Sequence, residues 1–270
     1  MNQEEGPRIY LLPNLMTAGN LLCGFAAVLR VLEGALLQNS SPDAAADLFR
    51  TAIWFILAAF IFDTLDGRVA RLSGQESPFG REFDSLADIV SFGVAPAIMV
   101  YRIVLQDFEP RAARTVACLY LVCGALRLAR FNCISASKGT GAADKDFKGF
   151  PIPAAAGLIA SLTLFMLWWA EGEHQLGRWK LVLPPLMIFL SFMMFSGVKY
   201  PSFKDFDWHA KKSVPKFLAI IGLLAFTGMN YEWMPAILFL AYLLYGFLRP
   251  WILRSRRPGI GRKHTPHPTK

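Results

Sequence analysis

Four aspartates in one short stretch are the residues of this chain best suited to chemistry. Asp63 and Asp66 stand three positions apart, and Asp84 and Asp88 stand four positions apart. On an α-helix both spacings put the two side chains on the same face. Between the pairs lies the stretch 72–81, which is short enough for a helical hairpin with opposed acidic faces. Four converging carboxylates repel one another, and hard divalent cations such as Mg²⁺, Mn²⁺ or Ca²⁺ relieve that repulsion.

Small and basic residues beside these aspartates indicate what such a site would bind. Gly67 follows Asp66 directly, Gly80 stands one turn before Asp84, and Arg71 stands one turn after Gly67. A glycine on a helix face lets a ligand approach closely, and an arginine pairs well with phosphate. The combination predicts a site for a metal-bound diphosphate. Buried ion pairs that join two helices are the structural alternative, although these stretches hold few basic partners.

The segments that carry these residues are apolar enough to cross a membrane. The chain is 54% hydrophobic and 18% charged, with a mean hydropathy of +0.37. Soluble domains carry about 25% charged residues, so a soluble or disordered chain is excluded. We predict an all-α integral membrane protein, a helical bundle of about eight transmembrane helices, each needing about 20 apolar residues. The expected spans are 14–37, 48–70, 84–105, 113–131, 152–170, 181–198, 215–229 and 233–252.

Charge in the loops predicts how this bundle sits in the membrane. We expect a single transmembrane domain, residues 1–252, and a basic tail, residues 253–270. With eight spans, the side that holds both termini carries 18 lysines and arginines, against 5 on the other side. Basic loops stay in the cytoplasm, so the termini and the acidic site are expected there, at a bacterial-type inner membrane. The net charge of +8 then reflects basic loops near lipid headgroups, not nucleic acid.

The aspartates, glycines and arginine form one continuous pattern. It is Asp63-x2-Asp66-Gly67-x2-Ala70-Arg71-x8-Gly80-x3-Asp84-x3-Asp88. This pattern resembles the signature of the CDP-alcohol phosphatidyltransferase family at all eight fixed positions and in every gap. The resemblance implies an enzyme that transfers a phosphatidyl group from a CDP-linked lipid to an alcohol and releases CMP. It also implies a homodimer.

The same resemblance implies a role for each signature residue. Asp63, Asp66 and Asp84 look like ligands of a centre of two divalent ions, Mg²⁺ or Mn²⁺. Asp88 looks like the general base and a further contact to one ion. A base is needed because an alcohol is a poor nucleophile at neutral pH. The remaining positions match residues that line the pocket for the CDP-lipid: Gly67, Ala70, Arg71 and Gly80.

The first predicted span carries one polar face. Asn14, Thr17 and Asn20 follow one another at intervals of three residues. This face suits the cytidine or ribose of the CDP-lipid. Hydrogen bonding between helices is the alternative use of such residues in a membrane.

Further motifs resemble the serine-accepting branch of the family, the phosphatidylserine synthases. These motifs are Leu12–Thr17, Gly19–Gly24, Asp88–Pro96, Ala125–Asn132, Phe147–Pro153 and Lys199–Lys204. The resemblance covers roughly residues 10–250. It implies that CDP-diacylglycerol is the donor and L-serine is the acceptor.

A serine acceptor brings a carboxylate that needs a cation, ideally the fork of an arginine. Arg127 and Arg130 stand three apart at the cytoplasmic end of the fourth span, with Asn132 and Lys148 nearby. Ser91 follows the predicted base by less than one turn and is placed to orient the acceptor. Each has an alternative: the arginines reach the membrane interface, Lys148 serves topology, and Ser91 packs helices together.

Two competing functions stay open at this point. Another acceptor, such as glycerol 3-phosphate, inositol or choline, would keep the family and change only the acceptor pocket. A cation transporter would use the acids as an ion pathway. Transporters often contain repeated halves, and we see no internal repeat in this sequence.

Overall fold

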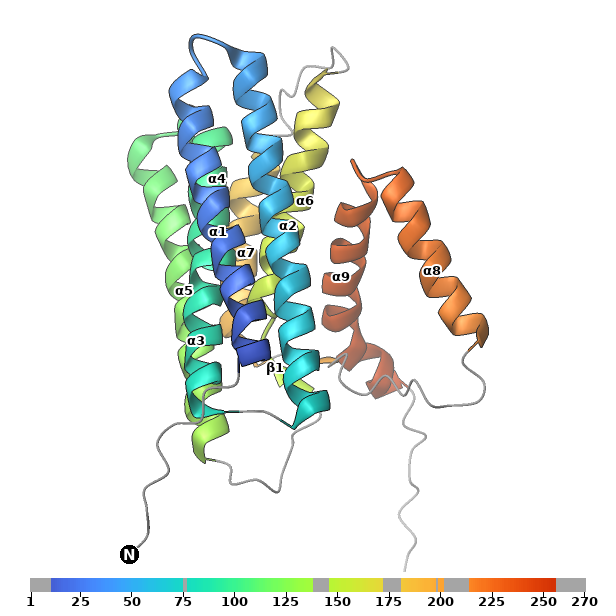
Figure 1. The fold of residues 1–270 in the computed structure, drawn as a ribbon. Coiled ribbons are helices and arrows are strands. Elements are labelled where there is room, and N and C mark those ends of the chain that lie inside the picture. Colours follow the sequence, from blue (N-terminus) through green and yellow to red (C-terminus); the bar gives the residue numbers. More distant parts are fainter. Residues whose placement is uncertain are drawn as a thin grey trace, which may run out of the picture.

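The computed structural model describes residues 11–74, 77–137, 146–171, 181–197, 199–201 and 214–255. Within these ranges the chain forms eight helical segments and one pair of three-residue strands (Figure 1). A helix occupies each of the eight expected spans, and the all-α membrane fold is confirmed. The predicted tail lies outside the described residues from position 256 onward.

The elements follow one another as an up-and-down bundle. The first half contains α1 (Leu11–Leu37), α2 (Pro42–Ser73), α3 (Pro78–Asp88), the π-helix η1 (Ile89–Val94), α4 (Ala95–Ile103), the 3₁₀ turn η2 (Leu105–Asp107) and α5 (Pro110–Ser137). The second half contains β1 (Asp146–Lys148), α6 (Ile152–Glu171), α7 (Leu183–Phe195), β2 (Lys199–Pro201), α8 (Val214–Met229) and α9 (Met234–Ser255).

Five of these segments are long and apolar enough to cross a membrane. They are Leu11–Leu37, Pro42–Ala70, Pro78–Ile103, Pro110–Ile134 and Ile152–Ala170. Two shorter apolar helices, Leu183–Phe195 and Met234–Leu248, accompany them. Figure 1 shows α1 and α2 side by side along their length, with α9 next to α6 and α8 at the edge of the bundle.

The third span begins six residues earlier than the sequence suggested. The Ser77 side chain caps α3 by accepting a hydrogen bond of 3.0 Å from the Gly80 amide, and Pro78 occupies the first turn. Gly80 and Asp84 therefore share one helix. Hydropathy alone does not predict this earlier start, because residues 78–83 include charged side chains that lower the mean hydropathy.

The same span contains a π-helical turn directly after Asp88. This turn, η1, is held from two sides. The hydroxyl of Ser91 donates to the backbone oxygen of Asn20 at 2.9 Å, and that of Tyr120 donates to the backbone oxygen of Phe92 at 3.0 Å. Isolated π-turns are frequent at functional sites, and this one directly follows Asp88.

A short two-stranded sheet and the loop after β1 lead into the start of α6. Strands β1 and β2 pair antiparallel. Gly149 has φ +86°, and a Cβ there would lie 2.3 Å from the Met194 carbonyl oxygen. The Phe150 amide donates to the Met193 carbonyl oxygen at 3.0 Å. This loop therefore packs closely against the end of α7. Pro151 and Pro153 come directly after it.

Candidate active site

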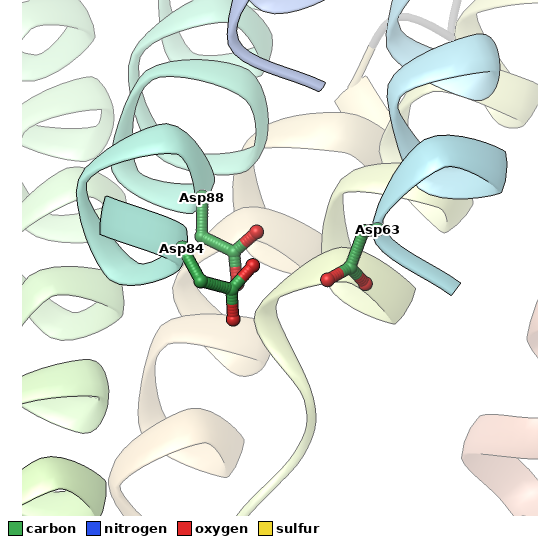
Figure 2. A group of neighbouring side chains, drawn as sticks. All are labelled: Asp63, Asp84 and Asp88. Carbon is green, nitrogen blue, oxygen red and sulfur yellow. The ribbon is translucent and has the colours of Figure 1, made fainter. Parts of the chain in front are cut away.

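Three of the four aspartates meet between α2 and α3. Figure 2 shows Asp84 and Asp88 adjacent on α3, with Asp63 facing them from α2. One oxygen of each carboxylate lies within 4.8 Å of the others. Asp88 is buried, and Asp63 and Asp84 are half-buried. The predicted hairpin with opposed acidic faces is therefore present.

Asp66 takes a different direction from the other three. Its buried carboxylate accepts a hydrogen bond from the Thr17 hydroxyl of α1, and it lies outside the cluster of Asp63, Asp84 and Asp88. Three residues advance an α-helix by about 300°, which leaves Asp66 about 60° around α2 from Asp63. That rotation turns it toward α1. The role of Asp66 as a metal ligand remains a prediction.

The polar face of α1 divides between two sets of partners. Asn14 lies against the start of α3, because a Cβ at Gly80 would stand 3.3 Å from the Asn14 Oδ1 atom. Thr17 meets Asp66. Asn14, Thr17, Asp66 and Gly80 thus gather at one end of the bundle. The Asn14 Nδ2 atom is buried there without a hydrogen-bond partner among the described residues.

Asn20 contacts the acidic cluster, and its predicted role in binding the CDP-lipid remains a prediction. Its Nδ2 group donates to Asp88 Oδ1 at 3.1 Å, and the Asn20 side chain is fully buried. The predicted base is therefore oriented by a neutral donor from α1. The Asn20 Oδ1 atom is buried without a hydrogen-bond partner in the described part of the chain.

A cavity of about 490 Å³ opens beside the acidic cluster. Segments far apart in the sequence build its wall, from α2, α3, α5, α6 with the loop before it, and α9. The lining residues are Phe60, Asp63, Thr64, Gly67, Arg68, Arg81, Asp84, Ser85, Asp88, Arg127, Leu128, Phe131, Asn132, Pro151, Pro153, Ala154, Leu238, Phe239 and Tyr242. Six of the predicted site residues are among them: Asp63, Gly67, Asp84, Asp88, Arg127 and Asn132.

Two of the predicted acceptor residues, Arg127 and Asn132 of α5, line this cavity. The Arg127 guanidinium interacts electrostatically with Asp88, and its Nε atom is buried without a hydrogen-bond partner among the described residues. Asn132 donates to the Ser85 hydroxyl at 3.0 Å and to Glu82 at 3.3 Å. Both residues therefore lie where an acceptor could meet the acidic cluster.

Other predicted acceptor residues lie elsewhere. Ser91 is fully buried and its hydroxyl bonds the backbone of α1, as a packing residue would. Arg130 is exposed. It donates to the Phe195 carbonyl oxygen at 3.4 Å, and its guanidinium lies over the Phe195 ring. Neither residue lines the cavity. The contact of Ser91 matches helix packing and that of Arg130 joins α5 to the end of α7, and their roles in serine binding remain predictions.

Three predicted residues add nothing to this geometry. Ala70 is half-buried on α2 and does not line the cavity. The side chains of Arg71 and Lys148 lie outside the described part of the structure. Their predicted contacts with the CDP-lipid or the acceptor remain predictions.

A comparison with models of known protein families matches residues 10–195, more than half of the chain, to the CDP-alcohol phosphatidyltransferases. This chain belongs to the CDP-alcohol phosphatidyltransferase family. The assignment inferred from the signature is confirmed. Members of this family generally use divalent metal ions, and the cluster of Asp63, Asp84 and Asp88 offers the hard oxygen ligands that such ions prefer.

Curated relatives agree with this membership. A CDP-diacylglycerol–serine O-phosphatidyltransferase of Helicobacter pylori is 36% identical over 247 residues, covering 90% of this chain and 92% of the relative. One of the same name from Methanocaldococcus jannaschii is 37% identical, covering 72% and 81%. An archaetidylserine synthase of Methanothermobacter thermautotrophicus is 36% identical, covering 74% of each chain.

Sequence reasoning missed several residues of this family member's cavity. Arg68 and Arg81 line it, and each directly follows a signature glycine, a signal that could have identified them. Ser85 lines it one residue after Asp84. Tyr242 stands 154 positions after Asp88, and no spacing in the sequence links the two.

Proposed function

We propose that this chain transfers the phosphatidyl group of CDP-diacylglycerol to the hydroxyl of L-serine and releases phosphatidylserine and CMP. The observation that carries the proposal is one cavity in which three carboxylates meet the Arg127 guanidinium. A phosphoryl-transfer centre and a cation for an acceptor carboxylate are then adjacent. The names of the relatives from Helicobacter pylori and Methanocaldococcus jannaschii support serine as the acceptor.

The donor occupies the side of the site formed by the signature. Asn14, Thr17 and Gly80 face the nucleotide, and Gly67 and Ala70 give it close access to α2. Arg68 and Arg81, which line the cavity, hold the phosphates together with Arg71. Hydrophobic chains of the lipid remain in the bilayer while the headgroup enters between the helices.

The aspartates would hold the divalent ions, Mg²⁺ or Mn²⁺ and two in number. Asp63, Asp84 and Asp88 fit this purpose by their convergence, and Asp66 joins them in the proposal from its place in the signature. When bound, such ions neutralise the diphosphate and stabilise charge on the attacking and leaving oxygens. The rest of the reaction depends on side chains of this chain.

Asp88 acts as the general base in a direct displacement. It takes the proton of the serine hydroxyl as the serine oxygen forms its bond to the phosphorus of the phosphatidyl group. The phosphorus–oxygen bond to CMP breaks, and CMP leaves. Asn20 keeps the Asp88 carboxylate directed into the site, since it donates to one carboxylate oxygen. Arg127 binds the serine carboxylate through guanidinium N–H groups.

The molecular setting is also a proposal. We place the site and both termini in the cytoplasm at a bacterial inner membrane, supported by the 18-to-5 bias of basic loop residues. Residues 1–252 form one catalytic domain and residues 253–270 a basic tail. A homodimer is proposed from family membership alone.

The test is CMP release by detergent-solubilised protein supplied with CDP-diacylglycerol and Mn²⁺ or Mg²⁺. Serine, glycerol 3-phosphate, inositol and choline are compared as acceptors. We expect release that requires serine and falls at least about 100-fold in Asp88→Asn, the effect typical of a lost general base. Asp107→Asn, which changes an exposed aspartate outside the cavity, is the matched control and is expected to keep full activity.

Each other outcome has a defined meaning. Release with a different acceptor would keep the family chemistry and overturn serine as substrate. Full activity in Asp88→Asn would overturn the assignment of the base. Absence of release with every acceptor, from protein shown to be folded, would overturn the transfer reaction and favour the cation transporter.

A further inference from the structure

The last helix supplies part of the cavity wall although it lies outside the family match. The matched residues end at position 195, whereas Leu238, Phe239 and Tyr242 of α9 line the cavity. Tyr242 is the one residue of these three with a polar side chain. The family signature therefore sets the acidic cluster, and a separate helix completes the space beside it.

Aromatic contacts hold α9 at the cavity. The Tyr242 ring lies 5.8 Å from the ring of Phe150, centroid to centroid, and Phe150 is fully buried. Phe239, one turn earlier, meets Phe60 of α2 edge-on at 5.4 Å. Tyr245 is 54% exposed and does not line the cavity. The phenol of Tyr242 is thus placed by packing on two sides, from α2 and from the loop before α6.

Tyr242 lies beside the cation proposed to bind the acceptor. Tyr242 and Arg127 line the same cavity, close enough for the phenol and the guanidinium to influence each other electrostatically. Arg127 also interacts electrostatically with Asp88, and all three residues line the same cavity. The Arg127 Nε atom is buried and unpaired among the described residues, which leaves a donor that a bound acceptor can satisfy.

We propose that Tyr242 is a positioning residue for acceptor specificity: it holds the Arg127 guanidinium in the cavity, where that cation recognises the carboxylate of a hydroxy amino acid. This inference rests on the proposed function. Without the phenol, the guanidinium moves toward the carboxylate of Asp88, because opposite charges attract strongly in a poorly hydrated site. Recognition of the acceptor carboxylate then weakens, while the donor side of the site is unaffected.

The experiment compares Tyr242→Phe with Tyr245→Phe, a matched loss of one hydroxyl on the same helix. Initial rates are measured with L-serine and with ethanolamine, which has the same hydroxyl and ammonium groups but no carboxylate. We expect Tyr242→Phe to raise the KM for serine about tenfold and to change the KM for CDP-diacylglycerol less than about twofold. The ratio of kcat/KM for serine to that for ethanolamine should fall about tenfold, as loss of one charge-assisted contact predicts. Tyr245→Phe should match wild type.

An unchanged serine-to-ethanolamine ratio in Tyr242→Phe would overturn the inference, as would a fall in kcat with both KM values unchanged. A double-mutant cycle with Arg127→Lys gives a second measurement. If Tyr242 acts through Arg127, its substitution adds little to Arg127→Lys, whereas full additivity would overturn that link. Wild-type protein that releases no CMP with serine would overturn the proposed function itself. If wild-type protein turns over serine normally and Tyr242→Phe leaves the serine-to-ethanolamine ratio unchanged, the inference is overturned and the proposed function stands.

Discussion

At the scale of single residues, each buried carboxylate has its own neighbour from α1. Thr17 donates to Asp66, and Asn20 donates to Asp88. A hydrogen bond to a charged group is worth about 1.5–3 kcal/mol and also limits the rotation of the acceptor. One helix thus orients two carboxylates that the signature places on two other helices.

The contact between Asn20 and Asp88 can be tested directly. We expect Asn20→Ala to lower kcat by roughly tenfold or more, because a hydrogen bond of about 1.5–3 kcal/mol no longer orients Asp88, the proposed base. Asn230→Ala, which removes an amide from the α8–α9 turn, should leave kcat unchanged. The measurement is CMP release at saturating serine and CDP-diacylglycerol. Equal kcat in Asn20→Ala and wild type would contradict an orienting role.

At the scale of elements, the close contact between α1 and η1 sets where Asp88 lies. A Cβ at Gly24 would stand 2.2 Å from the Ser91 Oγ atom and 2.6 Å from the Ser91 Cα atom. The two backbones can approach this closely only because Gly24 has no side chain. Since Asn20 and Gly24 share α1 while Asp88 and Ser91 share one span, this packing also brings the amide of Asn20 to the Asp88 carboxylate.

A methyl group at position 24 should therefore be costly. We expect Gly24→Ala to destabilise the protein by about 1–3 kcal/mol, the usual cost of overpacking a tight interface. Thermal unfolding in detergent measures this effect. Gly222→Ala is the matched control, because nothing lies within 4 Å of a Cβ at that helical position. Alanine favours helix by up to about 1 kcal/mol over glycine, so the control should be equal to wild type or slightly more stable. Equal melting temperatures for both variants would mean that α1 and η1 do not pack this closely.

At the scale of the whole molecule, one end of the bundle holds all the proposed chemistry. The end of α2, the start of α3 and the short sheet lie together there, and the turn between α1 and α2 lies at the opposite end (Figure 1). We propose from the bias in basic loop residues that the first end faces the cytoplasm. Serine and CMP would then enter and leave on the cytoplasmic side.

Labelling of single cysteines tests this orientation. In a background without the four native cysteines, Leu72→Cys lies at the exposed end of α2 and Ser40→Cys in the exposed turn between α1 and α2. In intact cells whose outer membrane has been made permeable, an impermeant maleimide should label Ser40→Cys and spare Leu72→Cys. Disruption of the inner membrane should expose both. The reverse pattern in intact cells would show that the site faces away from the cytoplasm.

The helices of the bundle, the family and the meeting of Asp63, Asp84 and Asp88 could be predicted from residue types and spacing alone. Long apolar runs have few other folds available, because a backbone in lipid must satisfy its hydrogen bonds internally. The pairing of Asp84 with Asp88 follows from helical spacing, and the short connection between α2 and α3 brings Asp63 opposite them. Each of these features depends on residues that lie close together in the sequence, so residue types and spacing were enough to predict it.

Which side chains share the cavity depends on how the helices pack against one another. Arg127 and Arg130 stand three apart, yet one faces Asp88 and the other meets Phe195 of α7. Tyr242 reaches the cavity because α9 packs on α2 and the loop before α6, a choice that no local spacing records. Lipid chains are as apolar as buried side chains, so hydropathy does not distinguish a helix face in lipid from one against a neighbour. Close packing makes that distinction, and it exists only in the folded bundle.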